Sequence, residues 1–300
     1  MKRKVIKQAS QAYTITLPIS WARENNLGKN SEVDVEVSGR FLLISSGKPI
    51  KGSTIKIDLN DVDFKQIYRH ITAAYAKGVD ELNIVSSKDI SSTITRALNS
   101  LIGYALISHE GDMYKIKDIN PGNYPDLDEI FKRVFQIILL FYDAAIKDIF
   151  GKENETLENL RARDNEVNKF CFYLQRAINK MSYSNQVKDR TIFTYSFELE
   201  KISDEIQRLW RTNINHKIKK SEEIKKITEM SKESIEKAFD SYYQFDNEAI
   251  SEIYDLREKI RKKSLSFSKL DSNTTRFLRH VVKIAEDAAD LNHLTLIKNL

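Results

Sequence analysis

The chain has little of the three residue types that most often shape a small fold. It has one cysteine, Cys171, in 300 residues, which excludes an internal disulfide framework and suits a reducing cytoplasm. We expect Cys171, flanked by Phe170 and Phe172, to be a core residue. The nine glycines form no phosphate loop, and there is no nucleophile elbow or metalloprotease helix motif. We therefore predict that the protein is not an enzyme.

Long apolar runs are missing as well. The longest, residues 134–142, contains Gln136 and is too short to cross a bilayer. The basic residues after Met1 are not followed by the apolar run of a signal peptide. The sequence predicts a cytoplasmic protein without membrane insertion.

Proline is absent after residue 125, and Gly151 is the only glycine from residue 126 to the end. Such a depletion predicts an array of helices, because these two residues are the strongest helix breakers. Apolar residues recur at helical spacing, as in Val167, Cys171, Leu174 and Ile178. We expect six helices joined by short connections into antiparallel bundles: 126–150, 153–183, 186–216, 221–245, 246–268 and 272–300.

Turn signals divide the chain into three predicted domains, at residues 1–49, 50–120 and 122–300. In the middle domain, strand and helix patterns alternate in the order βαβαββ. The expected strands and helices are 54–59, 61–75, 81–85, 90–101, 104–108 and 113–117. Overall we expect a multidomain α+β protein with a helical C-terminal part.

Positive charge is concentrated in the N-terminal domain, the smallest of the three predicted domains. Residues 1–48 hold 8 Lys/Arg and 4 Asp/Glu, whereas residues 121–300 hold 31 and 30. An excess of cations on a small domain is typical of a protein that binds the phosphate backbone of nucleic acid. A basic segment with no partner is the alternative reading of the same pattern.

The N-terminal domain has short elements: a basic strand at 2–8, a helix at 22–26, and strands at 33–37 and 41–44. Fewer than 50 residues cannot bury a useful core alone, so we predict a homodimer. We expect it to bind double-stranded DNA through nine residues: Lys2, Arg3, Lys4, Lys7, Gln8, Ser10, Gln11, Thr14 and Arg23.

Short motifs in this domain carry a resemblance. The segments 10–13, 16–18 and 28–33, together with Trp21, resemble the swapped-hairpin DNA-binding domain of the AbrB/SpoVT family. The resemblance implies a dimeric β-barrel. Two positions depart from that family: Asn30-Ser31 stand where it usually has Gly-Asp, and Ile19 where it often has Lys. Asn tolerates a left-handed backbone, so the turn is expected to persist.

The helical part shows a weak internal repeat, in which residues 199–205 align with 281–287. The Glu-x-Ile-x-Asp pattern at 200–204 and the segment 164–170 resemble PhoU proteins, and residues 67–78 resemble the middle region of archaeal PhoU-like regulators. The resemblance implies two three-helix bundles and a role in phosphate uptake regulation.

Glu200 and Asp204 lie at i and i+4, hence on one helical face that Asp164 is expected to share. Oxygen ligands of this kind favour a hard divalent cation or iron, and the resemblance implies metal binding here. In the repeat, Glu286 and Asp290 are kept, whereas Val282 replaces the Glu. The alternative is a solvated acidic face balanced by Lys201 and Arg208.

Two functions are therefore open. The first is a phosphate-responsive transcription regulator that binds DNA as a dimer and senses phosphate status through its helical domain. The second is an adaptor without DNA binding, whose helical domain docks on a phosphate ABC transporter ATPase or on a sensor kinase, and whose N-terminal hairpins only dimerise.

Overall fold

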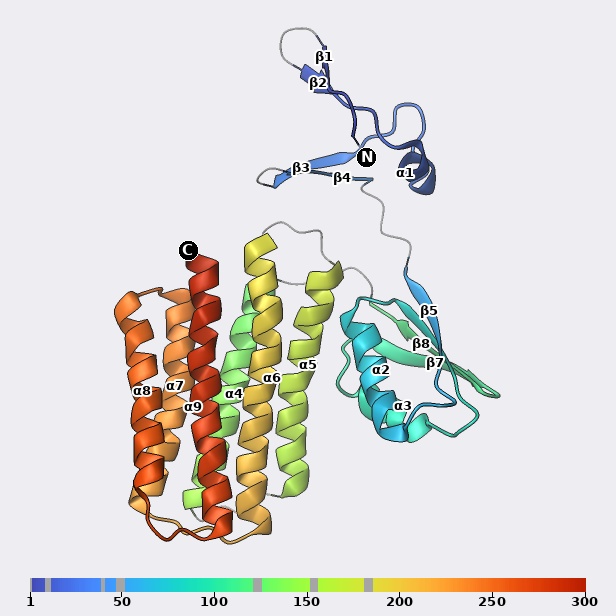
Figure 1. Ribbon diagram of the computed structural model, residues 1–300. Helices are drawn as coiled ribbons and strands as arrows, with labels where there is room; N and C mark the ends of the chain where they lie inside the picture. The colour runs from blue at the N-terminus through green and yellow to red at the C-terminus, as the bar shows by residue number, and fades with distance from the viewer. Residues whose placement is uncertain are drawn as a thin grey trace. The chain divides into compact units, whose positions relative to one another are not determined.

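The computed structural model describes residues 2–8, 12–38, 41–46, 52–120, 126–151, 156–180 and 186–300 (Figure 1). The contacts divide the chain into two compact units, Met1–Lys51 and Gly52–Leu300. The α/β segment and the helical segment both belong to the second unit.

The N-terminal unit is made of two hairpins and one short helix. Strands β1 (Ile6–Gln8) and β2 (Ala12–Thr14) form one antiparallel sheet, and β3 (Asp34–Ser38) and β4 (Phe41–Ser45) form another. Helix α1 spans Ile19–Glu24. No residue whose burial is described between 2 and 46 is buried. This unit therefore has no core of its own among those residues.

Two details of this unit bear on the predictions. Helix α1 begins at Ile19, directly after Pro18, so the predicted helix at 22–26 was placed too late in the chain. Proline fixes a φ that suits the residue just before a helix, which explains the early start. Asn30 has a φ of 65°, as expected for the residue that replaces a turn glycine.

The α/β segment is a four-stranded sheet with two helices on one face (Figure 1). The strand order is β5-β6-β8-β7, in which β5 and β6 are parallel and β8 is antiparallel to β6 and β7. The sequence order βαβαββ is as predicted. The elements are β5 (Thr54–Asp58), α2 (Phe64–Ala76), β6 (Glu81–Val85), α3 (Ser91–Leu98), β7 (Tyr104–Glu110) and β8 (Met113–Asp118).

Six helices then run up and down as a bundle (Figure 1). They begin and end within a few residues of the predicted bounds, as far as the described residues go. They are α4 (Leu127–Phe150), α5 (Leu157–Lys180), α6 (Gln186–Asn215), α7 (Glu222–Tyr243), α8 (Asn247–Ser266) and α9 (Ser272–Asn299). Side-chain oxygens of Asp126, Ser221, Asp246 and Asp271 accept backbone N–H bonds at four helix starts.

The packing of these helices follows their order in the chain. Helices α4, α5 and α6 contact one another, as do α7, α8 and α9, and the two groups meet where α6 packs on α9 and α4 on α7. One continuous apolar core fills the bundle, and Cys171 is buried in it as predicted. Within the described residues, no helix is both long and apolar enough to pass through a bilayer.

Candidate nucleic-acid interface and acidic helix face

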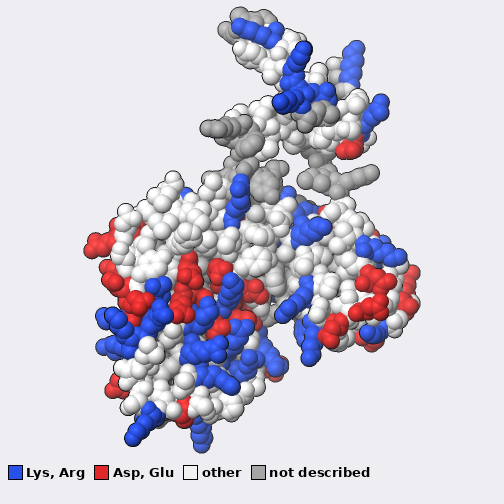
Figure 2. All heavy atoms as spheres, viewed as in Figure 1, with Lys and Arg blue, Asp and Glu red and all other residues white. Residues whose placement is uncertain are grey.

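The predicted cations of the N-terminal unit are accessible. Lys2, Arg3, Lys4, Lys7 and Arg23 are all exposed, and Figure 2 shows mainly Lys and Arg among the charged atoms on the viewed face of this unit. Lys29 is a further exposed cation next to the turn at Asn30. The unit therefore offers positive charge to a polyanion without prior rearrangement of its side chains.

The strand register separates the predicted DNA contacts into two groups. Lys7 pairs with Tyr13, whereas Gln8 pairs with Ala12 and Ile6 with Thr14. Because neighbouring side chains alternate between the faces of a strand, Lys7 lies opposite the face shared by Gln8 and Thr14. The Thr14 hydroxyl also donates a hydrogen bond to the Ile6 carbonyl, 3.3 Å away within its own hairpin.

The nine predicted DNA contacts stay a prediction, in which Lys7 lies on the other face of this hairpin from Gln8 and Thr14. Ser10 and Gln11 lie outside the described residues.

The second hairpin has an apolar face that points away from the unit's own residues. Val35 pairs with Ile44 and Val37 with Leu42, so these four side chains share one face of the sheet. Val35 is 56% exposed, Val37 74% and Leu42 52%. Apolar side chains gathered in this way on a sheet normally lie against another surface.

On the helical part, Asp164 lies where the sequence placed it, facing α6. Its side chain is buried, accepts a hydrogen bond from the Ser203 hydroxyl at 2.9 Å, and accepts a longer one from the Asn168 amide at 3.4 Å. Burial raises the pKa of Asp164 to about 6, against the opposing effect of the Ser203 bond. This carboxyl group is therefore partly protonated near neutral pH.

Glu200 and Asp204 share this environment. Burial, followed by the charges of Asp204 and Asp164, raises the pKa of Glu200 to about 7. Burial also raises the pKa of Asp204, although the Arg208 guanidinium, 2.5 Å from one of its oxygens, acts in the opposite direction. The predicted cluster thus exists as an electrostatically coupled group, with Asp204 partly neutralised by Arg208.

In the second half of the bundle, the predicted carboxylates Glu286 and Asp290 lie one helical turn apart on α9, and neither is buried. Glu286 lies 3.5 Å from the Arg261 guanidinium, and Asp290 is exposed. The buried acid of α9 is instead Asp287, which pairs with Lys283. Asp287 was not among the residues predicted from the sequence, although its alignment with Glu205 in the internal repeat could have indicated it.

Metal binding at Asp164, Glu200 and Asp204 stays a prediction. Among the described residues, no three or more His, Cys, Asp or Glu side chains are grouped so that they could hold a metal ion. The side-chain oxygen of Asn168 is buried without a hydrogen-bond partner, beside Asp164. One unpaired amide oxygen does not complete a ligand set, so we derive no step through a metal.

The raised pKa of Glu200 predicts how the stability of the protein depends on pH. A carboxyl whose pKa is higher in the folded state lowers stability as pH rises, because the folded state holds its proton more tightly. We expect Glu200→Gln to raise stability at pH 8 by roughly 1 to 2 kcal/mol, a value discounted for partial exposure. At pH 4.5 the gain should vanish.

Thermal unfolding in the presence of a chelator at both pH values measures this effect. Glu233→Gln removes the same charge from an exposed position on α7 and serves as the control. An equal gain at both pH values would show that packing, and not protonation, is responsible.

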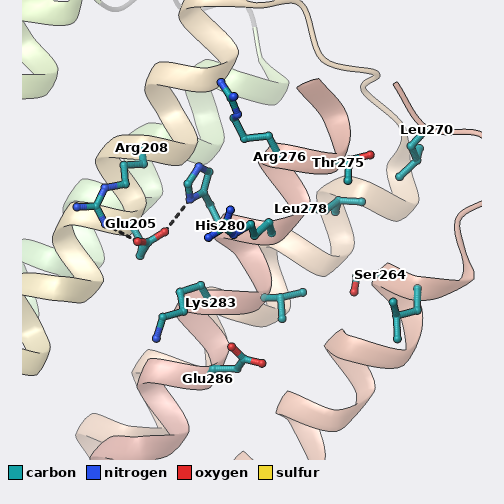
Figure 3. Close-up of a pocket in the computed structure, with 13 residues that line it drawn as sticks. Glu205, Arg208, Ser264, Leu270, Thr275, Arg276, Leu278, His280, Lys283 and Glu286 are labelled. Atoms are coloured by element: carbon teal, nitrogen blue, oxygen red, sulfur yellow. Dashed lines mark hydrogen bonds and ion pairs between the residues drawn. The ribbon is translucent and has the colours of Figure 1, made fainter. Parts of the chain in front are cut away.

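The sequence also missed a polar bridge between the two halves of the bundle. His280 of α9 lies 2.6 Å from one carboxylate oxygen of Glu205 on α6, and Arg208 binds the other (Figure 3). Burial opposes the ionised form of Glu205, but the hydrogen bonds from His280 and Arg208 lower its pKa. This bridge joins α6 to α9 beside the apolar core.

Comparison with known families adds one finding. The sequence model of a family described as "Antidote-toxin recognition MazE, bacterial antitoxin" matches residues 6–54, about a sixth of the chain. The match supports a MazE/AbrB-like domain at the N-terminus, within a mixed α+β protein. No curated protein matches the chain.

Proposed function

We propose that the protein is a transcription regulator that binds DNA as a dimer through its N-terminal domain. The observation that carries this proposal is the set of exposed cations on a small unit matched by the MazE family model. Domains of the MazE/AbrB-like kind typically dimerise and bind DNA. In the proposed dimer, hairpins of two chains close the swapped-hairpin barrel that one chain cannot form.

The finer part of the proposal is that the regulator responds to phosphate status through its helical domain. It rests on the resemblance of segments 164–170 and 200–204 to PhoU proteins, and on the packing of α4–α6 and α7–α9 as two groups of three. A cation at Asp164, Glu200 and Asp204 stays a prediction, and no step of the proposal depends on it.

Two other functions are supported by specific observations. The family description favours an antitoxin-type regulator, in which the domain next to the DNA-binding unit would bind a toxin protein. An adaptor without DNA binding, docked on a transporter ATPase or a sensor kinase, is favoured by Ile19. This side chain is 65% exposed at the start of α1, where a cation is usual.

Charge reversal separates these functions. Lys4→Glu with Lys7→Glu removes four cations from each dimer, and each lost phosphate contact lowers the salt dependence of log K by about 0.9. We expect the negative slope of log K against log salt to become less steep by about 3.6. The affinity for a mixed duplex pool should fall at least 100-fold, because the new carboxylates also repel the DNA phosphates.

The full-length variant is compared with Lys56→Glu and Lys117→Glu, two exposed lysines of the α/β segment that change the net charge equally. Retention of DNA by the control and its loss in the first variant would support the regulator. Equal retention by wild type and both variants would place DNA binding elsewhere, and no retention by any of them would favour the adaptor.

A further inference from the structure

The helical bundle has an uneven charge distribution along its length. Residues 208–226 and 257–280, which include the ends of α6 and α8 and the starts of α7 and α9, hold 15 Lys/Arg and 4 Asp/Glu. The rest of residues 121–300 holds 16 and 26. Figure 2 shows Lys and Arg gathered over the lower part of the bundle, below a band of Asp and Glu. One end of the bundle is therefore an anion-attracting surface.

A groove opens on this surface between α6, the end of α8 and α9 (Figure 3). Its volume is about 780 Å³, within the range of small-molecule sites. A smaller hollow of about 220 Å³ lies next to it and shares Arg208, Arg276 and His280 as lining residues; we call the groove and the hollow together the cleft.

Several cations of the cleft are already neutralised within the protein. Arg208 is bound by Asp204 and Glu205, His280 by Glu205, and Lys283 by Asp287. These pairs hold the wall of the cleft in place and add little net charge to it.

Three guanidinium groups remain. Within the part of the chain that the structure describes, no carboxylate forms an ion pair with Arg211, Arg276 or Arg279, and all three are exposed. Arg276 and Arg279 lie one helical turn apart on α9 and both line the groove, whereas Arg211 of α6 lines the smaller hollow together with Arg276. Guanidinium groups bind phosphate through two parallel N–H bonds each, so this trio matches an anion with several phosphate oxygens.

Part of the groove lining is apolar. It consists of Leu265 at the end of α8, Leu270 in the following loop, and Leu278 and Val282 of α9, which together we call the apolar wall. Leu265 is 84% exposed, although it lies beside a concave surface. A bare inorganic anion gains nothing from such a wall, whereas a ligand with an apolar or planar body can cover it.

We propose that this cleft binds a nucleotide-class ligand, with its phosphates on Arg211, Arg276 and Arg279 and its base on the apolar wall. Binding to the cleft is independent of the N-terminal domain. Only the assignment of this ligand as the effector of the helical region rests on the proposed function.

Titration calorimetry of the full-length protein with ATP, tripolyphosphate and adenosine, at constant ionic strength and without metal, tests the proposal. We expect ATP to bind more tightly than tripolyphosphate, because only ATP covers the apolar wall, and adenosine to bind weakest. Arg276→Gln with Arg279→Gln should weaken ATP binding about 10-fold to 100-fold. Lys259→Gln with Lys262→Gln, on the exposed side of α8, removes the same charge and should leave binding unchanged.

The proposal would be overturned if wild type did not bind ATP, or if it bound ATP and tripolyphosphate equally. It would also be overturned if Arg276→Gln with Arg279→Gln lost affinity for duplex DNA but kept its affinity for ATP. Circular dichroism checks that this variant, altered only at exposed positions, keeps its helices. If the proposed DNA binding is wrong, wild type does not retain DNA but still binds ATP. If the proposed ligand site is wrong, Lys4→Glu with Lys7→Glu still loses DNA while wild type does not bind ATP, so the two proposals fail separately.

Discussion

Replacement of Arg176 by Met should destabilise residues 52–300 by about 3 to 5 kcal/mol, the usual cost of removing one partner of a buried ion pair. Arg176 lies on α5, but its guanidinium is inserted into the α/β segment and its side chain is 1% exposed. It donates to the Tyr75 and Val79 carbonyls at 3.0 and 2.7 Å and to Asp118 at 2.5 Å.

The size of the expected effect comes from what the substitution leaves behind. Asp118 is 3% exposed and would lose the cation at its carboxylate. Two backbone carbonyls would lose their bonds to Arg176, and the contacts of the guanidinium with the Tyr75 and Tyr104 rings, at 4.8 and 5.1 Å, would disappear. Asp80 keeps Lys180 as a partner, so the loss is concentrated at Asp118.

Urea unfolding followed by circular dichroism measures the change. Arg257→Met is the control, because it removes an arginine of α8 whose contacts, among the described residues, are local ones with Glu258 and the Tyr254 ring. In Arg176→Met with Asp118→Asn the buried charge is also gone, so part of the stability should return. If Arg176→Met unfolds at the same urea concentration as wild type, the bonds of Arg176 do not stabilise the contact between the α/β segment and α5.

The contacts of Arg176 could not be predicted from the sequence. Its partners Tyr75, Val79 and Asp118 are 58 to 101 residues away in the chain. The six helices were predictable because the lack of proline and glycine and the spacing of apolar residues are local signals. A bond between distant elements leaves no local pattern, so a buried arginine looks like any other basic residue on a helix.

The candidate sites show the same limit. Asp164, Glu200 and Asp204 were predictable as a cluster, since an i, i+4 pair fixes one face of α6. The pairing of Asp204 with Arg208, and of His280 with Glu205, depends on side-chain direction and on the packing of α6 against α9. The cations of the cleft, at 208–211 and 276–279, belong to two segments that only the fold brings together.

Introducing charge into the apolar face of the β3–β4 hairpin should abolish the proposed dimer. We expect Val35→Asp with Val37→Asp to halve the mass measured by light scattering, because four added carboxylates per dimer would have to be buried in its interface. Val35, Val37, Leu42 and Ile44 share this face, and no residue of known burial from 2 to 46 is buried within one chain. In the proposed dimer, a second copy supplies the missing core.

DNA affinity should fall together with the mass. Two linked basic units bind one duplex far more tightly than a single unit, so their separation should weaken binding by more than about 100-fold. Ile107→Asp with Met113→Asp, at exposed apolar positions of β7 and β8, is the control and should change neither quantity. A dimer that persists in Val35→Asp with Val37→Asp would mean that residues 52–300 hold it together. In that case the exposed hairpin face must be covered by a different protein, such as the toxin or the adaptor target considered above.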